Sequence, residues 1–282
     1  MSDLITEAED LAMTGKIPEA IAKYEEAIAE DATNPLPFVG KASLLKATGK
    51  YAEAAEDLGK ALAILPEWQV AKEDEKRYHD FVSMLHVLRA EAYLYADSPD
   101  EALADLDAAD AAREPDAASM VVRANAYAQK QEWMQAGDLL YRAEEWCFLH
   151  EDSMLTQVWL TKVHCAQEAG GGIFAPPYAA EIYASGNWRM PKGTADELLE
   201  RAGNLKKEGL IYDALRYYDA CIAAGPENKA HVLFLKGVAF EQLKRFDDAY
   251  SLYSDALAAN PDASEEFAIR VRWANTKALR SD

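Results

Sequence analysis

The sequence predicts an all-α fold, a solenoid of stacked antiparallel helix pairs. The first observation behind this prediction is a short apolar seam that recurs with one spacing in six places: Ala20-Tyr24-Ala27, Ala54-Leu58-Ala61, Ala102-Leu106-Ala109, Ala136-Leu140-Ala143, Ala214-Tyr218-Cys221 and Ala249-Tyr253-Ala256. The second is the interval between the first alanines of successive seams, which is 34, 48, 34, 78 and 35 residues. A period of about 34 residues with two insertions explains every interval, and such a period is typical of repeats that pack on their neighbours.

The clearest repeat, from Pro35 to Trp68, reads as two short amphipathic helices joined by a tight turn. Ala42 lies midway along the first helix, Gly49-Lys50-Tyr51 forms the turn, and Pro66 ends the second helix. Other repeats keep a small residue in the first helix and several have a proline after the second: Ala8, Ala42, Ala90, Ala124, Ala202 and Gly237, and Pro66, Pro226 and Pro261.

With these features in register, the chain resembles the tetratricopeptide repeat (TPR) family over nearly its whole length. The resemblance implies a right-handed superhelix of about seven repeats plus a C-terminal capping helix. It also implies that the first helices of the repeats line a concave groove, and that the protein binds a partner protein there.

The repeats divide the chain into segments: repeats 1 and 2 in residues 1–68, a helical junction in 69–82, repeats 3 and 4 in 83–150, a degenerate repeat 5 in 151–193, repeats 6 and 7 in 194–263, and the capping helix in 264–282. The junction is either a short helix between two blocks or part of one long helix that runs into Tyr95. We favour the junction, which would form a joint. In the capping helix we expect the apolar residues to cover the last repeat: Phe267, Ile269, Val271, Ala274 and Ala278.

Repeat 5 departs from the pattern, because Gly170-Gly171-Gly172 and Pro176-Pro177 interrupt it and enlarge its turn. Phe174, Tyr178 and Trp188 lie near this turn. They either belong to a functional loop on a rigid scaffold or pack to hold the loop in place. Self-assembly through this region is the alternative function that the sequence leaves open.

Acidic residues outnumber basic ones by 49 to 29, which gives a formal charge of −20. Binding to nucleic-acid phosphates or to an anionic membrane surface needs clustered Lys and Arg, so both partners are disfavoured. The charge either keeps an extended surface soluble or steers a basic partner toward it.

The N-terminal residues have no basic stretch followed by an apolar core, and no apolar run approaches the roughly 18 residues of a membrane helix. The three cysteines are too few for a disulfide framework. We therefore expect a cytoplasmic protein without membrane insertion.

No motif for nucleotide binding, acyl transfer or metal-dependent hydrolysis is present, so the sequence predicts neither an enzyme nor a cofactor or metal site. Cys147, His150, His164 and Cys165 are the only cluster of metal-ligand types. The adjacent His164 and Cys165 would point in directions about 100° apart on a helix, so ordinary packing is the better interpretation.

The resemblance places the candidate peptide-binding groove at eleven positions: Ile5, Glu9, Val39, Val87, Glu91, Leu94, Tyr95, Val121, Asn125, Leu199 and Phe234. Chaperone adaptors of the family grip a peptide's terminal carboxylate with Lys and Asn at such positions; here only Asn125 matches, so we expect this clamp to be absent. Apolar residues interspersed with glutamates suit an amphipathic helix or an extended, basic peptide. The alternative is that some of these residues pack between repeats. The resulting hypothesis is a non-enzymatic scaffold or adaptor that binds a protein or peptide, with a homo-oligomer as the second possibility.

Overall fold

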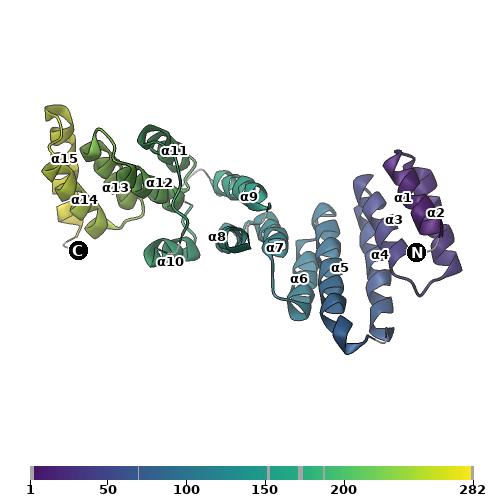
Figure 1. Cartoon of the computed structure of the whole chain (residues 1–282). Helices are drawn as coiled ribbons and strands as arrows, with labels where there is room; N and C mark the ends of the chain where they lie inside the picture. The colour runs from purple at the N-terminus through teal and green to yellow at the C-terminus, as the bar shows by residue number, and fades with distance from the viewer. Residues whose placement is uncertain (1–2, 69, 151–152, 171–173, 187, 281–282) are drawn as a thin grey trace. The chain divides into compact units, whose positions relative to one another are not determined.

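The computed structural model describes residues 3–68, 70–150, 153–170, 174–186 and 188–280, and within them the chain is helical without any β-strand (Figure 1). The all-α solenoid prediction is therefore confirmed, whereas the number of repeats and the hand of the superhelix stay predictions. The chain divides into two compact units: unit 1 is Met1–Glu132 and unit 2 is Trp133–Asp282.

Unit 1 contains seven α-helices among its described residues: α1 (Asp3–Met13), α2 (Ile17–Glu30), α3 (Leu36–Ala47), α4 (Tyr51–Ile64), α5 (Glu75–Tyr95), α6 (Pro99–Ala112) and α7 (Ala117–Gln129). Short 3-10 turns at Leu65–Glu67 and Lys72–Asp74 connect α4 to α5. Each helix packs on the next, and the helices α1 to α6 lie side by side in Figure 1.

Unit 2 contains eight α-helices in the part of the chain that is described: α8 (Trp133–His150), α9 (Leu155–Glu168), α10 (Pro177–Ser185), α11 (Ala195–Lys207), α12 (Ile211–Ala224), α13 (Lys229–Gln242), α14 (Phe246–Ala258) and α15 (Ala263–Leu279). The helix α8 packs on both α9 and α10, and α12 contacts α10, α11 and α13. None of the described helices is both long and apolar enough for a membrane crossing.

The recurring seams are the buried core of both units. Ala20, Ala54 and Ala102 in unit 1 and Ala214 and Ala249 in unit 2 are all fully buried. Because alanine lets two helix backbones approach closely, larger residues at these positions would overpack the core.

Two seam tyrosines occupy space left by a glycine of the neighbouring helix. A Cβ atom at Gly40 would lie 2.4 Å from Cζ of Tyr24, and one at Gly237 would lie 2.4 Å from Cε1 of Tyr253. Real Cβ atoms do not approach so closely, so glycine is required at both places for the ring to enter. The same packing solution thus appears once in each unit.

The expected junction at 69–82 takes the second of its two arrangements, because α5 runs without a break from Glu75 to Tyr95. No glycine or proline interrupts the sequence between Trp68 and Ser98, so nothing stops the helix. The segment also packs on the preceding repeat: the Tyr78 hydroxyl donates to the Leu65 carbonyl at 3.3 Å, and the rings of Trp68 and Phe81 stack. Gln69 lies outside the described residues.

The closing helix α15 packs on α14 with a different face from the one expected. Ile269 and Thr276 are fully buried, and Trp273 stacks on Tyr250 and donates from Nε1 to Ser254 Oγ at 3.0 Å. The other residues expected to cover the last repeat, Phe267, Val271, Ala274 and Ala278, are exposed. Spacings of four and three residues place 269, 273 and 276 on one face of the helix. Because Thr276 is polar and Trp273 is large, the hydrophobic pattern of the sequence did not indicate this face.

The described part of the enlarged turn in repeat 5 packs on α8. Phe174 is buried, its backbone N–H donates to the Gly209 carbonyl at 3.0 Å, and its ring and Pro176 lie over Gly137. Residues 171–173, which include two of the three expected turn glycines, lie outside the described residues. Phe174 therefore serves packing within unit 2.

Candidate binding sites in the two units

Three of the expected groove residues lie in the cores between helices. Ile5 (3% exposed) packs in a cluster with Ala8 and Tyr24; Leu94 (7%) and Val121 (4%) are likewise buried. Their side chains have little surface left for a partner. The alternative interpretation, packing between repeats, describes these three residues.

The other expected groove residues keep exposed surface. Glu9 and Tyr95 are exposed, and Tyr95, at 64%, stacks on Tyr51 with ring centroids 5.0 Å apart. The remaining residues are partly exposed, in unit 1 Val39, Val87, Glu91 and Asn125, and in unit 2 Leu199 and Phe234.

Two of these residues, Val87 and Glu91, line a hollow of about 480 Å³ in unit 1. Both lie on one face of α5, together with Phe81, Met84 and Leu88. The opposite side is formed by the segment from the end of α6 into α7, which contributes Arg113, Asp116 and Ala118. The hollow thus has an apolar floor on α5, where Met84 is 41% exposed.

Carboxylates predominate at the edge of this hollow. Asp80, Glu91 and Asp116 line it, against the single guanidinium of Arg113. Arg113 pairs with Asp116 and lies 3.8 Å from Asp80 Oδ1, and Glu91 pairs with Lys46 at 2.5 Å. The apolar floor and the acidic edge together suit an amphipathic segment with basic residues.

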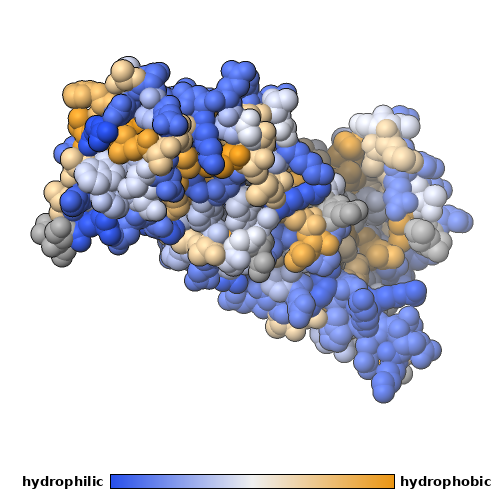
Figure 2. Space-filling view, turned by 60° about the vertical axis from the view of Figure 1, so that its left-hand side comes forward, coloured by the Kyte–Doolittle hydropathy of each residue, from blue (hydrophilic) through white to orange (hydrophobic). Residues whose placement is uncertain are grey.

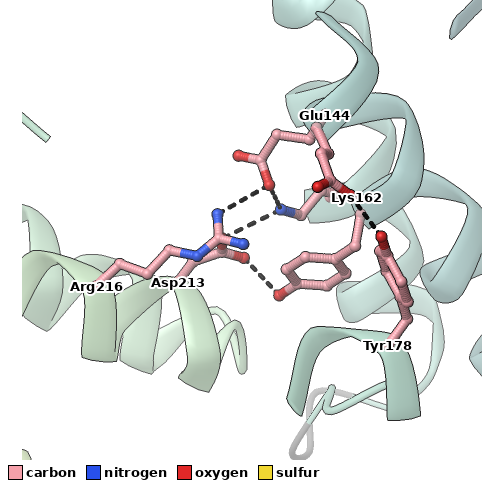
Figure 3. Close-up of polar contacts among 7 residues, drawn as sticks. Glu144, Lys162, Tyr178, Asp213 and Arg216 are labelled. Carbon is pink, nitrogen blue, oxygen red and sulfur yellow. Dashed lines mark hydrogen bonds and ion pairs between the residues drawn. The ribbon is translucent and has the colours of Figure 1, made fainter. Parts of the chain in front are cut away.

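Unit 2 holds a cluster of charges that the sequence did not reveal (Figure 3). Lys162 Nζ on α9 lies 3.1 Å from Glu144 Oε2 on α8 and 3.1 Å from Asp213 Oδ1 on α12. Arg216 Nη1, one turn after Asp213, lies 3.0 Å from Glu144 Oε2. All four side chains are at least 95% buried.

The cluster is balanced, since two cations meet two carboxylates in the protein interior, where an unpaired charge is costly. Tyr141 adds a neutral donor, with its hydroxyl 2.6 Å from Asp213 Oδ2. Burial and the neighbouring Asp213 carboxylate raise the pKa of Tyr141, so the phenol stays protonated and donates. Lys162 Nζ also lies 3.7 Å from the centroid of the Tyr141 ring, a cation–π contact.

One sequence signal could have pointed to this cluster. Lys162 follows Val158 by four residues and precedes Cys165 by three, so it lies on the apolar face of its helix. Both apolar neighbours are fully buried. A charged residue on such a face needs a partner, but the sequence did not show that the partners are on α8 and on α12, 51 residues away from Lys162.

A cavity of about 600 Å³ adjoins the cluster, and Glu144, Asp213 and Arg216 form part of its wall. Helices α8, α9, α11 and α12 and the segment 189–192 enclose it. All of these elements belong to unit 2.

The metal-ligand types of unit 2 lie in ordinary packing positions. Cys147 and Cys165 are buried, and burial raises the pKa of the Cys165 thiol to about 11. His150 stacks on Trp146. Across the ranges that the structure describes, no three His, Cys, Asp or Glu residues are grouped to hold a metal ion.

Comparisons with known proteins agree with the repeat pattern. A model of the tetratricopeptide repeat family matches residues 199–264. Over 71 residues the chain is 34% identical to the tetratricopeptide repeat and J domain-containing co-chaperone DNJ1 of Fusarium oxysporum f. sp. lycopersici, a match that covers 25% of this chain and 14% of that relative. The chain therefore spans only a small part of the length of this curated relative.

Two solved structures align with most of the chain. A tetratricopeptide repeat protein from Parabacteroides merdae is 15% identical, with a TM-score of 0.45 and 98% of both chains covered. YrrB, a TPR protein described as having an unusual peptide-binding site, is also 15% identical, with a TM-score of 0.42 and 88% of this chain and 97% of that chain covered.

Proposed function

We propose that this chain is a member of the tetratricopeptide repeat family, whose model matches residues 199–264, and that it is a non-enzymatic, cytoplasmic scaffold that binds a segment of a partner protein. The observation that carries the proposal is the hollow of unit 1. It is lined by Val87 and Glu91, two positions that the family resemblance assigns to the groove.

The chemistry of the hollow favours an amphipathic helix with a basic face. Phe81, Met84 and Leu88 offer apolar surface along α5, which suits the apolar side of such a helix. The three carboxylates at the edge suit Lys or Arg beside that apolar side, whose long side chains reach outward. The charge of −20 adds long-range attraction for a basic partner.

The self-assembling scaffold is the second function that the sequence leaves open. Of its three expected contact residues, Phe174 is buried, the Tyr178 hydroxyl donates to Glu145, and Trp188 stacks on Tyr183. These contacts within unit 2 make the region a poorer candidate than the hollow. A sedimentation coefficient that rises with protein concentration would support self-assembly instead.

The test uses a labelled helical peptide of about 15 residues with a leucine face and a lysine face, and measures its binding by fluorescence anisotropy. Met84→Lys replaces an apolar contact with a like charge, so we expect about tenfold weaker binding. Met134→Lys is the matched control, since Met134 is also 41% exposed but belongs to α8 of unit 2 and does not line the hollow. Equal affinity of the two variants, or equal binding of the same peptide with glutamates in place of lysines, would contradict the proposal.

A further inference from the structure

We propose that the 600 Å³ cavity of unit 2 binds a small organic anion, one acidic head group on an apolar body. This site is separate from the hollow of unit 1 and takes a ligand of opposite charge. The volume lies within the range of pockets that hold small molecules, about 300–1,000 Å³.

Most residues of the cavity wall are apolar, which suits the apolar body of the proposed ligand. Phe148 on α8, Trp159 on α9 and Leu205 on α11 face the cavity from three helices. The rest of the apolar lining comes from Leu155, Leu160, Val163, Met190, Pro191 and Tyr217. Leu160 and Met190 are 62% and 48% exposed, which leaves their surface available to a ligand. Figure 2 shows apolar areas among hydrophilic ones on the face of the molecule that it presents.

The acidic head group is suggested by the charges of the wall. Lys162 and Arg216 balance Glu144 and Asp213 within the buried cluster. This leaves Arg189, Lys192 and Arg201, which also line the cavity, without a carboxylate partner among the residues described. Three unbalanced cations around one cavity stand out in a chain of charge −20. Arg189, Lys192 and Arg201 are themselves exposed, and their summed positive charge attracts anions to the cavity although the whole chain repels them.

A second, independent observation comes from two buried atoms. Glu144 Oε1 and Arg216 Nε have no hydrogen-bond partner in the described structure, and both residues line the cavity. Buried polar atoms are nearly always satisfied, and each unsatisfied one costs about 1–3 kcal/mol. A ligand carboxylate that reaches the cluster would accept from Arg216 Nε, whereas Glu144 Oε1, itself an acceptor, needs a donor such as a water molecule.

A second cavity of about 410 Å³ shares Glu144, Phe148, Arg189 and Arg216 with the first. It is lined by Glu145, which adds a negative charge, and it lacks Lys192 and Arg201. The larger cavity is therefore the better anion site. Leu160 lines only the larger cavity and Leu149 only the smaller one, which separates them experimentally.

The test measures, by titration calorimetry, the affinity of three ligands with the same apolar chain: decanoate, decan-1-ol and decylammonium. The two ions are kept below their micelle concentrations and the alcohol below its solubility limit. We expect decanoate to bind tightest, because only its carboxylate meets the three cations. If decan-1-ol or decylammonium binds as tightly as decanoate, the proposal is wrong.

Charge variants test whether the three cations of the cavity wall bind the carboxylate of decanoate. The triple variant Arg189→Gln, Lys192→Gln, Arg201→Gln should weaken decanoate binding about tenfold and leave decan-1-ol binding unchanged. The matched control is Lys207→Gln, Lys229→Gln, Lys244→Gln, which removes three exposed cations of unit 2 outside the cavity. Equal decanoate affinity of the two triple variants would overturn the assignment.

A pair of apolar variants then distinguishes the two cavities. Leu160→Asp should weaken decanoate binding at least about tenfold, whereas Leu149→Asp should leave it unchanged. The reverse result would overturn the assignment to the larger cavity. An acidic peptide that binds the cavity more tightly than decanoate, as measured by displacement of bound decanoate, would overturn the assignment to a small molecule.

Discussion

The two units of the chain bury charge in different ways. In unit 1, Asp105 on α6 is nearly fully buried and accepts hydrogen bonds from Arg89 Nε at 2.7 Å and contacts His86 Nδ1 at 2.8 Å, both on α5. The side chains of Arg89 and His86 are 23% and 17% exposed, so both partners of Asp105 remain in contact with water. In unit 2, both cations and both carboxylates of the cluster are at least 95% buried.

This difference decides what happens when one partner is removed. Water can reach the Asp105 carboxylate once the partly exposed Arg89 is shortened, so the charge is solvated again. The side chains of the unit 2 cluster are at least 95% buried, so removing one cation leaves a carboxylate excess largely shielded from water. The unit 2 cluster therefore makes the packing of α8, α9 and α12 sensitive to single substitutions, even if the charges contribute little net stability.

The largest effect is expected from Lys162→Met. The substitution keeps an unbranched side chain but leaves Glu144 and Asp213 against Arg216 alone, so we expect the free energy of unfolding to fall by about 3–5 kcal/mol. Urea denaturation followed by circular dichroism measures it. Lys207→Met, at an exposed position of unit 2, is the control and should change it by less than about 0.5 kcal/mol.

A double variant shows whether charge or packing causes that loss. Adding Asp213→Asn to Lys162→Met restores the balance between Glu144 and Arg216. The double variant should therefore be more stable than Lys162→Met alone. If it is less stable, the loss comes from packing and hydrogen bonds rather than from the unpaired charge.

A smaller effect is expected from Arg89→Gln in unit 1. Asp105 loses its two hydrogen bonds from the guanidinium but keeps His86 and gains access to water, so we expect a loss of about 1–3 kcal/mol. The same denaturation experiment measures it. A loss of unfolding free energy as large as that of Lys162→Met would show that partial exposure does not reduce the cost of removing the cation. The contrast between the two units would then be wrong.

The smallest effect is a change in acid sensitivity. Burial acts to raise the pKa of Asp105, but hydrogen bonds from Arg89 and His86 outweigh it and hold that pKa below its usual value. A carboxyl whose pKa is lower in the folded state stabilises the fold above the unfolded pKa, near 3.9, and this contribution is lost as the pH falls through the folded value. Unfolding free energies measured between pH 5 and pH 3 should therefore fall less steeply for Arg89→Gln than for the unaltered protein. Equal slopes would mean that the contact between Asp105 and Arg89 does not contribute to the loss of stability at low pH.

The candidate sites were only partly predictable from the sequence. Val87 and Glu91 line one hollow on α5, because helical periodicity fixes which residues share a face, and their role in binding stays a prediction. Ile5, Leu94 and Val121 were expected at the same kind of position but are buried, because the neighbouring helices cover them. A period in the sequence shows which residues lie together, but it does not show how far the adjacent helix extends over them.

The sequence by itself determined the helix pairs and their alanine seams. Seam residues such as Ala54 and Leu58 are buried as expected, since a small residue at a fixed period can only serve close helix packing. The tertiary structure alone decided that Lys162 meets Asp213 across 51 residues, and that Trp273 rather than Phe267 faces the last repeat. These contacts depend on how one helix is rotated against another. Contacts between residues distant in the sequence set that rotation, whereas the local spacing of residues does not determine it.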